Sequence, residues 1–379
     1  MTVTHLYNDD QLMLRDTARP FLAEPGVAQR RVLRDRDDRT GFCPELWGRF
    51  AELGLTGVMA PESAGGAGLG HVEAGLVLHE IGRNLTASPF SATSVGAVTA
   101  LRAAQPASQA AWLAQISAGH VVCAIGFDER PRHRPVCVTT TAVPTENGYR
   151  LNGAKRFIDA GQGASALIFS ARTSGQTEAS QGVTLFIAPT TAPGLTLRHE
   201  RLADGGLIAE AVFDDVELDA SAVLGLVGEG TALRSRVLNA LRVAVAAELV
   251  GLAERAFEIT LGYLQDRRQF GAPIGSFQGL QHRAAHLYCE LELARASTIR
   301  AQQALDEDPD KAGRAASVAK ATSGLTANLV VQEAVQMHGG IGMTDEHDIG
   351  LFMKRAQVLN ALYGDPDFHA DLLARDSGF

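Results

Sequence analysis

A single carboxylate, Glu248, lies inside an otherwise apolar stretch, VAVAAELVGLA, at residues 243–253. An apolar setting disfavours the charged form of a carboxyl group, which suits a general base that removes a proton from a weak carbon acid. The alternative role is structural, because buried charges are usually paired. In that case the partner is an arginine on a neighbouring helix, for which Arg283 is a candidate. The sequence leaves both interpretations open.

Two histidines, His282 and His286, stand four residues apart, which is the spacing of the HExxH zinc motif. The residues between them are Arg283, Ala284 and Ala285, so the glutamate of that motif is missing. The four cysteines are scattered without CxxC spacing and are typical of reduced thiols. We therefore expect no metal site.

The elements that must position these residues fall into three predicted domains, and the predicted fold class is α+β. Residues 1–118 show helical spacing of apolar positions, interrupted by the glycine-rich loop APESAGGAGLG at 60–70. Residues 119–228 contain short β-type runs separated by turn signals, which predicts a mostly antiparallel β domain. Residues 229–379 predict a bundle of four antiparallel helices, over 231–269, 276–306, 311–338 and about 345–362.

The composition argues against several classes of protein. The chain has 379 residues and a formal net charge of −9. Because phosphate contacts need clustered Lys and Arg, nucleic acid is not the expected partner. No apolar run is long enough to span a bilayer, and the start, MTVTHLYNDDQ, lacks the features of a signal peptide. We expect a cytoplasmic protein without a membrane helix.

The most specific motifs are DRRQFGAPIGSFQGLQH at 266–282 and VQMHGGIGMTDEH at 335–347. Together with APESAGGAGLG and the helix–β–helix order, they resemble the acyl-CoA dehydrogenase family. The resemblance covers essentially the whole chain. It implies FAD as the cofactor, an acyl-CoA thioester as the substrate and α,β-dehydrogenation as the reaction. It also implies an electron-transfer flavoprotein as the electron acceptor and a tetrameric assembly.

The resemblance implies a set of cofactor-binding residues around the first motif. Arg267, Gln269 and Phe270 match the RxxFG-type motif, which in the family contacts the FAD pyrophosphate and adenine across a subunit interface. Arginine suits a diphosphate because its planar guanidinium donates two hydrogen bonds. Gln278 belongs to the same element.

A second set follows from the motif at 335–347. Gln336, Gly339 and Gly340 match the QxxGG turn, which in the family lies against the FAD of the neighbouring subunit. Glycines at such a turn let backbone N–H groups approach the cofactor closely.

The predicted β domain departs from the family pattern. CAIGFDERP replaces the usual Thr-Glu-Pro run, with Ile125 at the place of the flavin-binding threonine. In the next segment Phe157 replaces a tryptophan and is expected to pack on the flavin ring. Asp159 replaces a hydroxyl near flavin N5, where an ionised carboxylate disfavours the reduced, anionic flavin. Alternatively, Asp159 caps a turn.

Neither position at which family members hold the catalytic carboxylate has an acid here. Counting from the QxxGG turn places Tyr363 at the first position, and counting back from the RxxFG-type motif places Leu241 at the second. Two candidates remain. Asp365 lies two residues beyond Tyr363, or is simply a turn residue before Pro366. Glu248 lies seven residues after Leu241, on the same helix face and roughly 10 Å further along.

Arg242 holds the place of an arginine near the family's acyl-CoA site. We predict that it orients the substrate or the base. The alternative is a surface cation at a helix turn.

These departures resemble a branch found among bacterial degraders of dicarboxylic, steroid-derived or other bulky acids. Members of this branch often form α2β2 assemblies with a second acyl-CoA dehydrogenase-like chain, so a homo- or heterotetramer is expected. One alternative is a flavin-dependent monooxygenase on the same fold, which needs no α-proton base and would oxygenate an amine without responding to acyl-CoAs. Another is a non-catalytic partner subunit, which would lack yellow colour and activity until its second chain is added.

Overall fold

The computed structural model describes residues 7–23, 41–104 and 108–379. The chain divides into two compact units. The sheet unit comprises Asp37–Ala74 and Ala87–Leu241. The helical unit comprises Met1–Arg36, Gly75–Thr86 and Arg242–Phe379. The order of helices, mostly antiparallel sheet and helices confirms the predicted α+β class.

Short helices precede the strands of the sheet unit. They are α3 (Pro44–Glu52), η2 (Glu62–Ala64), the π-helical η3 (Ser91–Ala97), α5 (Val98–Ala104) and α6 (Ser108–Ser117). Pro44 suits the first position of α3, where the missing N–H would have no partner within the helix. The glycine-rich loop folds closely on itself, because a Cβ at Gly66 would lie 2.2 Å from the Ala60 carbonyl oxygen.

The sheet has the strand order β6-β7-β3-β2-β4-β5-β8, and β1 pairs with β4. The β1–β4 and β2–β4 pairings are parallel and the others are antiparallel. The ring of Phe169 stacks on that of Phe186 and meets that of Phe213 at a tilt, and these rings fill part of the core of the sheet. The strands are β1 (Cys123–Gly126), β2 (Thr141–Pro144), β3 (Gly148–Asp159), β4 (Ala166–Arg172), β5 (Val183–Pro189), β6 (Leu195–Arg201), β7 (Leu207–Asp219) and β8 (Val223–Leu224).

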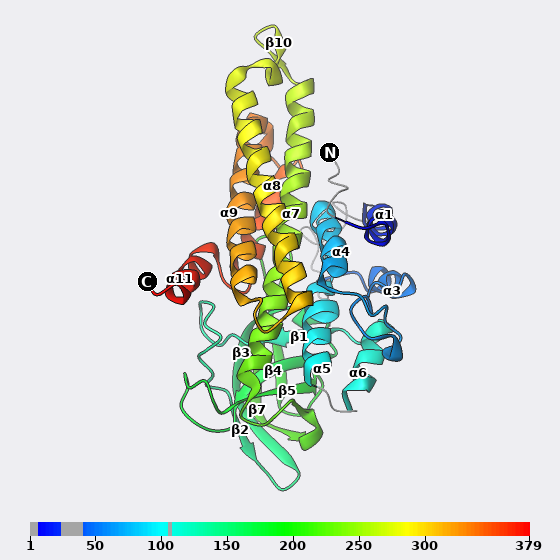
Figure 1. Cartoon of the computed structure of the whole chain (residues 1–379), viewed down its shortest axis with the longest axis vertical. Coiled ribbons are helices and arrows are strands. Elements are labelled where there is room, and N and C mark those ends of the chain that lie inside the picture. The colour runs from blue at the N-terminus through cyan, green and yellow to red at the C-terminus, as the bar shows by residue number, and fades with distance from the viewer. Residues whose placement is uncertain (1–6, 24–40, 105–107) are drawn as a thin grey trace. The chain divides into compact units, whose positions relative to one another are not determined.

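The helical unit is built on long helices that lie side by side in Figure 1. Its first helices are α1 (Asp9–Ala23) and most of α4 (His71–Asn84). Helix α7 (Gly230–Asp266) enters this unit at Arg242. A small hairpin of β9 (Arg268–Gln269) and β10 (Ala272–Pro273) with η6 (Ile274–Ser276) leads to α8. The remaining elements are α8 (Gln278–Glu307), α9 (Gly313–His338), η7 (Gly339–Met343), α10 (Ile349–Ala361) and α11 (Pro366–Asp376).

Burial on all sides explains the apolar character of the middle of α7. Every residue from 237 to 253 is buried. A helix that is apolar all round is expected to lie inside a protein. Helix α4 crosses α7 so closely that no side chain fits between their backbones. A Cβ at Gly82 on α4 would lie 2.0 Å from the Glu248 carbonyl oxygen. A Cβ at Gly251 on α7 would lie 2.0 Å from the His79 carbonyl oxygen.

The four predicted long helices of the last region correspond to α7, α8, α9 and α10. Helix α11 was not among the expectations. Pro366 stands in its first turn and Asp365 caps it, so the turn signal at Asp365-Pro366 is also a helix start. Among the helices of residues 7–23, 41–104 and 108–379, none combines the length and apolar character needed to cross a membrane.

Candidate active site

The connection between α7 and α8 presents the first predicted cofactor motif. Gln269 pairs with Ala272 across the β9–β10 hairpin, and Phe270 at φ 54° and Gly271 at φ 80° make its turn. Phe270 is 92% exposed, and its ring meets the edge of Phe277 at 6.2 Å between centroids. A positive φ at a non-glycine residue costs free energy, and so does an apolar ring exposed to water. The hairpin bears both costs at Phe270, which is typical of a surface that contacts another molecule.

The end of α9 carries the second predicted motif, and ring stacking brings the two motifs to the same end of the bundle. The ring of His338 lies 4.5 Å from that of Tyr263, four residues before Arg267 on the chain. It also lies 4.4 Å from the ring of His347. The turn that follows contains Gly339, at φ 65°. The stacking of His338 on Tyr263 holds the QxxGG turn against the last turns of α7.

The residues at this end fit a polar cofactor that lies outside the chain. All of the predicted ones are exposed, and no side-chain hydrogen bond or ion pair joins them to another described residue; they are Arg267, Gln269, Phe270, Gln278, Gln336, Gly339 and Gly340. A Cβ at Gly339 or Gly340 would meet no atom within 4 Å. Unengaged guanidinium and amide donors beside an open glycine turn suit a dinucleotide such as FAD.

In the sheet unit, Phe157 lies at an irregularity of β3. The pairing of β3 with β7 shifts register between Lys155 and Ile158, and Phe157 has a φ of 54°. Its side chain is 42% exposed. Bulges often redirect a side chain beside an active site. An exposed ring at this position fits the predicted stacking of Phe157 on a flavin. Ile125, which stands at the place of the family's threonine, is buried in β1.

Beneath this bulge lies a buried ion pair that the sequence interpretation missed. Lys155 is fully buried, and its Nζ donates to Glu129 Oε1 at 2.5 Å and to Ser170 Oγ at 3.1 Å. Burial lowers the pKa of Lys155 to about 8, against the opposing effect of the Glu129 charge. A lysine inside the strand-like run YRLNGAKRFID was the signal that could have found it.

Glu248 is buried and paired, but the predicted partner was wrong. Its Oε1 accepts from Arg355 Nε at 3.0 Å and from Arg355 Nη2 at 2.7 Å, so α10 supplies the cation. Arg283 instead bonds Glu333, at 2.6 Å from Nε. Both contacts end on the same oxygen, and no hydrogen bond joins Glu248 Oε2 to another described residue. One oxygen of the carboxylate therefore remains to accept a proton.

Arg242 is buried, so its alternative interpretation as a surface cation was wrong. Its Nε donates to the Tyr363 carbonyl oxygen at 3.2 Å, and its guanidinium lies 5.6 Å from the centre of the Phe368 ring. Asp365 is exposed, and its Oδ1 accepts from the Phe368 N–H at 2.8 Å as the cap of α11. Arg242 and Asp365 thus meet the same short segment.

The three predicted catalytic residues follow one seam between α7 and the α10–α11 segment. Glu248 meets Arg355 on α10, and Arg242 meets Tyr363 just beyond the end of α10. Six residues on α7 separate these contacts, which is roughly 9 Å along the helix axis. Asp365 lies at the Arg242 end of this seam.

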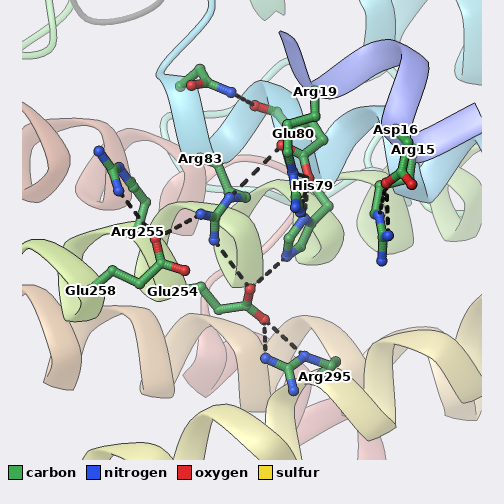
Figure 2. Close-up of polar contacts among 11 residues, drawn as sticks. Arg15, Asp16, Arg19, His79, Glu80, Arg83, Glu254, Arg255, Glu258 and Arg295 are labelled. Atoms are coloured by element: carbon green, nitrogen blue, oxygen red, sulfur yellow. Dashed lines mark hydrogen bonds and ion pairs between the residues drawn. The ribbon is translucent and has the colours of Figure 1, made fainter. Parts of the chain in front are cut away.

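A further polar network, also missed from sequence, joins α1, α4, α7 and α8 (Figure 2). Glu80 accepts from Arg19 at 2.7 Å, and His79 Nε2 lies 2.9 Å from Glu254 Oε2. Arg295 on α8 bonds Glu254 at 2.8 Å from Nε. Burial opposes the charge of each group. Even so, the carboxylates raise the pKa of His79 to about 9, and their cationic partners lower those of Glu80 and Glu254 to about 2.

No group of three or more His, Cys, Asp or Glu within residues 7–23, 41–104 and 108–379 is arranged to hold a metal ion. His286 lies 3.6 Å from Glu290 on its own helix. The HExxH-like spacing at His282 and His286 therefore has no third ligand in the described chain.

Comparison with protein families matches three domains in the same order along this chain. Residues 8–120 match "Acyl-CoA dehydrogenase, N-terminal domain". Residues 134–216 match "Acyl-CoA dehydrogenase, middle domain", and residues 228–378 match "Acyl-CoA dehydrogenase, C-terminal domain".

Individual relatives agree with these matches. The mitochondrial isovaleryl-CoA dehydrogenase of Pongo abelii is 30% identical over 93% of this chain and 84% of its own. A solved variant of the Tcur3481-Tcur3483 steroid ACAD has a TM-score of 0.88 at 28% identity, covering 97% of both chains. A chain in the structure of the electron transferring flavoprotein of Acidaminococcus fermentans has a TM-score of 0.91 at 28% identity, covering 100% of both.

Proposed function

Because the chain belongs to the acyl-CoA dehydrogenase family, whose members act on the CH–CH bond of acyl-CoA, we propose that it catalyses FAD-dependent α,β-dehydrogenation of an acyl-CoA thioester. The observation that carries this proposal is the ordered match of all three family domains to residues 8–378. The exposed, unengaged donors at the α7–α8 connection and the displayed Phe157 ring support it.

The cofactor is proposed to lie against residues of both motifs. Arg267 and Gln269 donate to the diphosphate and adenine parts, and the open turn at Gly339 and Gly340 leaves room for close approach of the backbone. Because the family's RxxFG-type motif contacts FAD across a subunit interface, Phe157 is proposed to pack separately, on the flavin ring of an FAD that those residues of another subunit contact. When bound, FAD supplies the acceptor for the hydride that leaves Cβ.

Glu248 is the proposed base. Arg355 holds its Oε1, which orients the carboxylate, while Oε2 is proposed to accept the proton from the substrate's α-carbon. The electron pair of the broken Cα–H bond then forms the Cα=Cβ bond. On this assignment the α-carbon lies about two helical turns along α7 from the Leu241 position.

Asp365 is the second candidate for the base, and its geometry favours it less. One of its oxygens caps α11 and its side chain is exposed to water, so it lacks the buried setting of Glu248. Arg242, buried beside the same turn, is proposed to orient the acyl-CoA.

Three further parts complete the proposal. The first is a substrate with a bulky acyl group, the second is an electron-transfer flavoprotein as the electron acceptor, and the third is a tetramer of one chain or of two unlike chains. The likeness to a steroid ACAD variant supports the first. The likeness to a chain of an electron transferring flavoprotein structure supports the second. Exposed side chains at the α7–α8 connection support contact with another subunit.

The test is anaerobic titration of the purified yellow protein with straight-chain, branched, dicarboxylic and steroid-side-chain acyl-CoAs, followed by loss of flavin absorbance. We expect at least one bulky acyl-CoA to bleach the flavin. Glu248→Gln should slow bleaching by about 10²–10⁴-fold, whereas Asp365→Asn should have little effect. Bleaching of Glu248→Gln at the parent rate would exclude Glu248 as the base. Absence of bleaching with every acyl-CoA, with and without a second chain, would refute the dehydrogenase proposal.

A further inference from the structure

Lys320 is a fully buried lysine of α9 that the proposed chemistry does not yet use. Its Nζ donates to the carbonyl oxygens of Asn360, at 3.1 Å, and of Gly364, at 2.9 Å. No carboxylate of the described residues forms an ion pair with it. A buried ammonium that bonds only backbone carbonyls is unusual, because buried charges are normally neutralised by a partner.

The two carbonyls lie on either side of Tyr363. Asn360 is in the last turn of α10, whose final carbonyls have no partner within the helix and carry partial negative charge. Gly364 immediately precedes Asp365, the cap of α11. Lys320 therefore joins the end of one helix to the start of the next.

The segment between them has a constrained backbone. Tyr363 has a φ of 58° and Gly364 a φ of 104°. A Cβ at Gly364 would lie 2.5 Å from the Phe368 ring, so this glycine is required by both its conformation and its surroundings. Residues held in such conformations persist only where surrounding contacts enforce them.

A second buried cation acts on the same turn from the opposite helix. Arg242 of α7 donates to the Tyr363 carbonyl oxygen at 3.2 Å. The carbonyls of residues 360, 363 and 364 are thus each held by a buried cation. Since N–H and C=O point in opposite directions in a trans peptide, these bonds also fix the direction of the Gly364 and Asp365 N–H groups.

Mutual repulsion limits how much charge this arrangement tolerates. Burial lowers the pKa of Lys320 to about 7, the charge of Arg242 acts in the same direction, and Asp365 opposes them. At a pKa of about 7, both protonation states of Lys320 are present near neutral pH, and each can donate N–H hydrogen bonds to the two carbonyls of the turn.

We propose that Lys320 is a positioning residue that, together with Arg242, holds the turn 361–365 in the conformation needed for acyl-CoA oxidation. This rests on the proposed function and on the count along the chain that places Tyr363 at one of the two positions where family members hold the catalytic carboxylate. Lys320 acts through the backbone of the turn and not on the reacting atoms.

The variant that tests this is Lys320→Met, which keeps the length of the side chain but removes its charge and donors. Lys311→Met, on an 86%-exposed side chain just before α9, is the matched control. With the acyl-CoA that bleaches the parent, we expect Lys320→Met to lower the limiting rate of flavin reduction at least 10-fold. The half-saturating concentration of acyl-CoA should stay within about 3-fold, and the control should match the parent.

Hydrogen exchange without substrate provides a second readout. Amides of peptides covering 358–369 should exchange at least 10-fold faster in Lys320→Met, while peptides from α8 should be unchanged. Unaltered exchange in 358–369, or an unaltered limiting rate, would overturn the proposal. Faster exchange throughout α8 and α9 would overturn it as well, because it would show a general packing defect.

If Lys320→Met yields no soluble protein, Lys320→Gln, which retains an amide donor, is compared by the same two measurements with the same criteria. If no acyl-CoA reduces the parent, the proposed function fails, and the exchange measurement still decides whether Lys320 holds the turn.

Discussion

His79 offers the sharpest test of how the helical unit is held together. Its ring lies between Glu254 and Glu80, and its neighbours Arg19, Arg83 and Arg295 bind the same carboxylates (Figure 2). Burial by itself would lower the pKa of the imidazole, but the two carboxylates outweigh this and raise it from 6.5 to about 9. The folded protein therefore favours the protonated ring.

The magnitude follows from this shift. A rise of the pKa from 6.5 to about 9 corresponds to about 3 kcal/mol of preferential stabilisation of the charged ring. Because 21% of the side chain remains exposed, solvent screening reduces the expected value to about 2 kcal/mol. The pKa is raised on folding, so this contribution is fully present below pH 6.5 and is lost as the pH rises through about 9.

The substitution His79→Gln keeps an N–H donor for Glu254 but cannot be charged. We expect it to lower the free energy of unfolding by about 2 kcal/mol at pH 6 and by much less at pH 10. Urea unfolding monitored by circular dichroism at the two pH values measures this. The exposed His120, changed to Gln, is the control and should have no effect at either pH. An equal loss at pH 6 and pH 10 would refute the assignment of a charged His79.

Two further predictions concern the helix crossing and the cofactor. Gly82→Ala should destabilise the protein by about 1–3 kcal/mol in the same urea assay, because its Cβ would lie 2.0 Å from the Glu248 carbonyl oxygen. Gly262→Ala on α7, where a Cβ meets nothing within 4 Å, should instead be neutral or slightly stabilising, and an equal loss would contradict the close crossing. Arg267→Ala should weaken FAD retention about 10-fold, measured as the ratio of flavin to protein absorbance after gel filtration. Arg300→Ala, on an exposed arginine of α8, should retain FAD like the parent, and full retention by Arg267→Ala would remove that residue from the cofactor site.

Local pattern was sufficient for most of the fold. The β-type runs became β1 to β7 because alternation and turn residues act over a few positions, and the long helical segments became α7 to α10. Helix α11 was missed because Asp365-Pro366 was interpreted only as a turn, although a capping Asp followed by Pro is equally a helix start. The bounds of the three predicted domains remain a prediction beside the two compact units.

For the candidate site, the sequence determined which residues carry chemistry, because motifs such as RxxFG and QxxGG are contiguous and Glu248 contrasts with its own neighbours. It could not determine the partners. Arg355 rather than Arg283 meets Glu248, and Lys320 meets carbonyls 40 and 44 residues away. These pairings depend on which helix faces pack together, and that is decided only in the folded chain. The close approach of α4 and α7 at Gly82 and Gly251 is likewise a property of the folded chain.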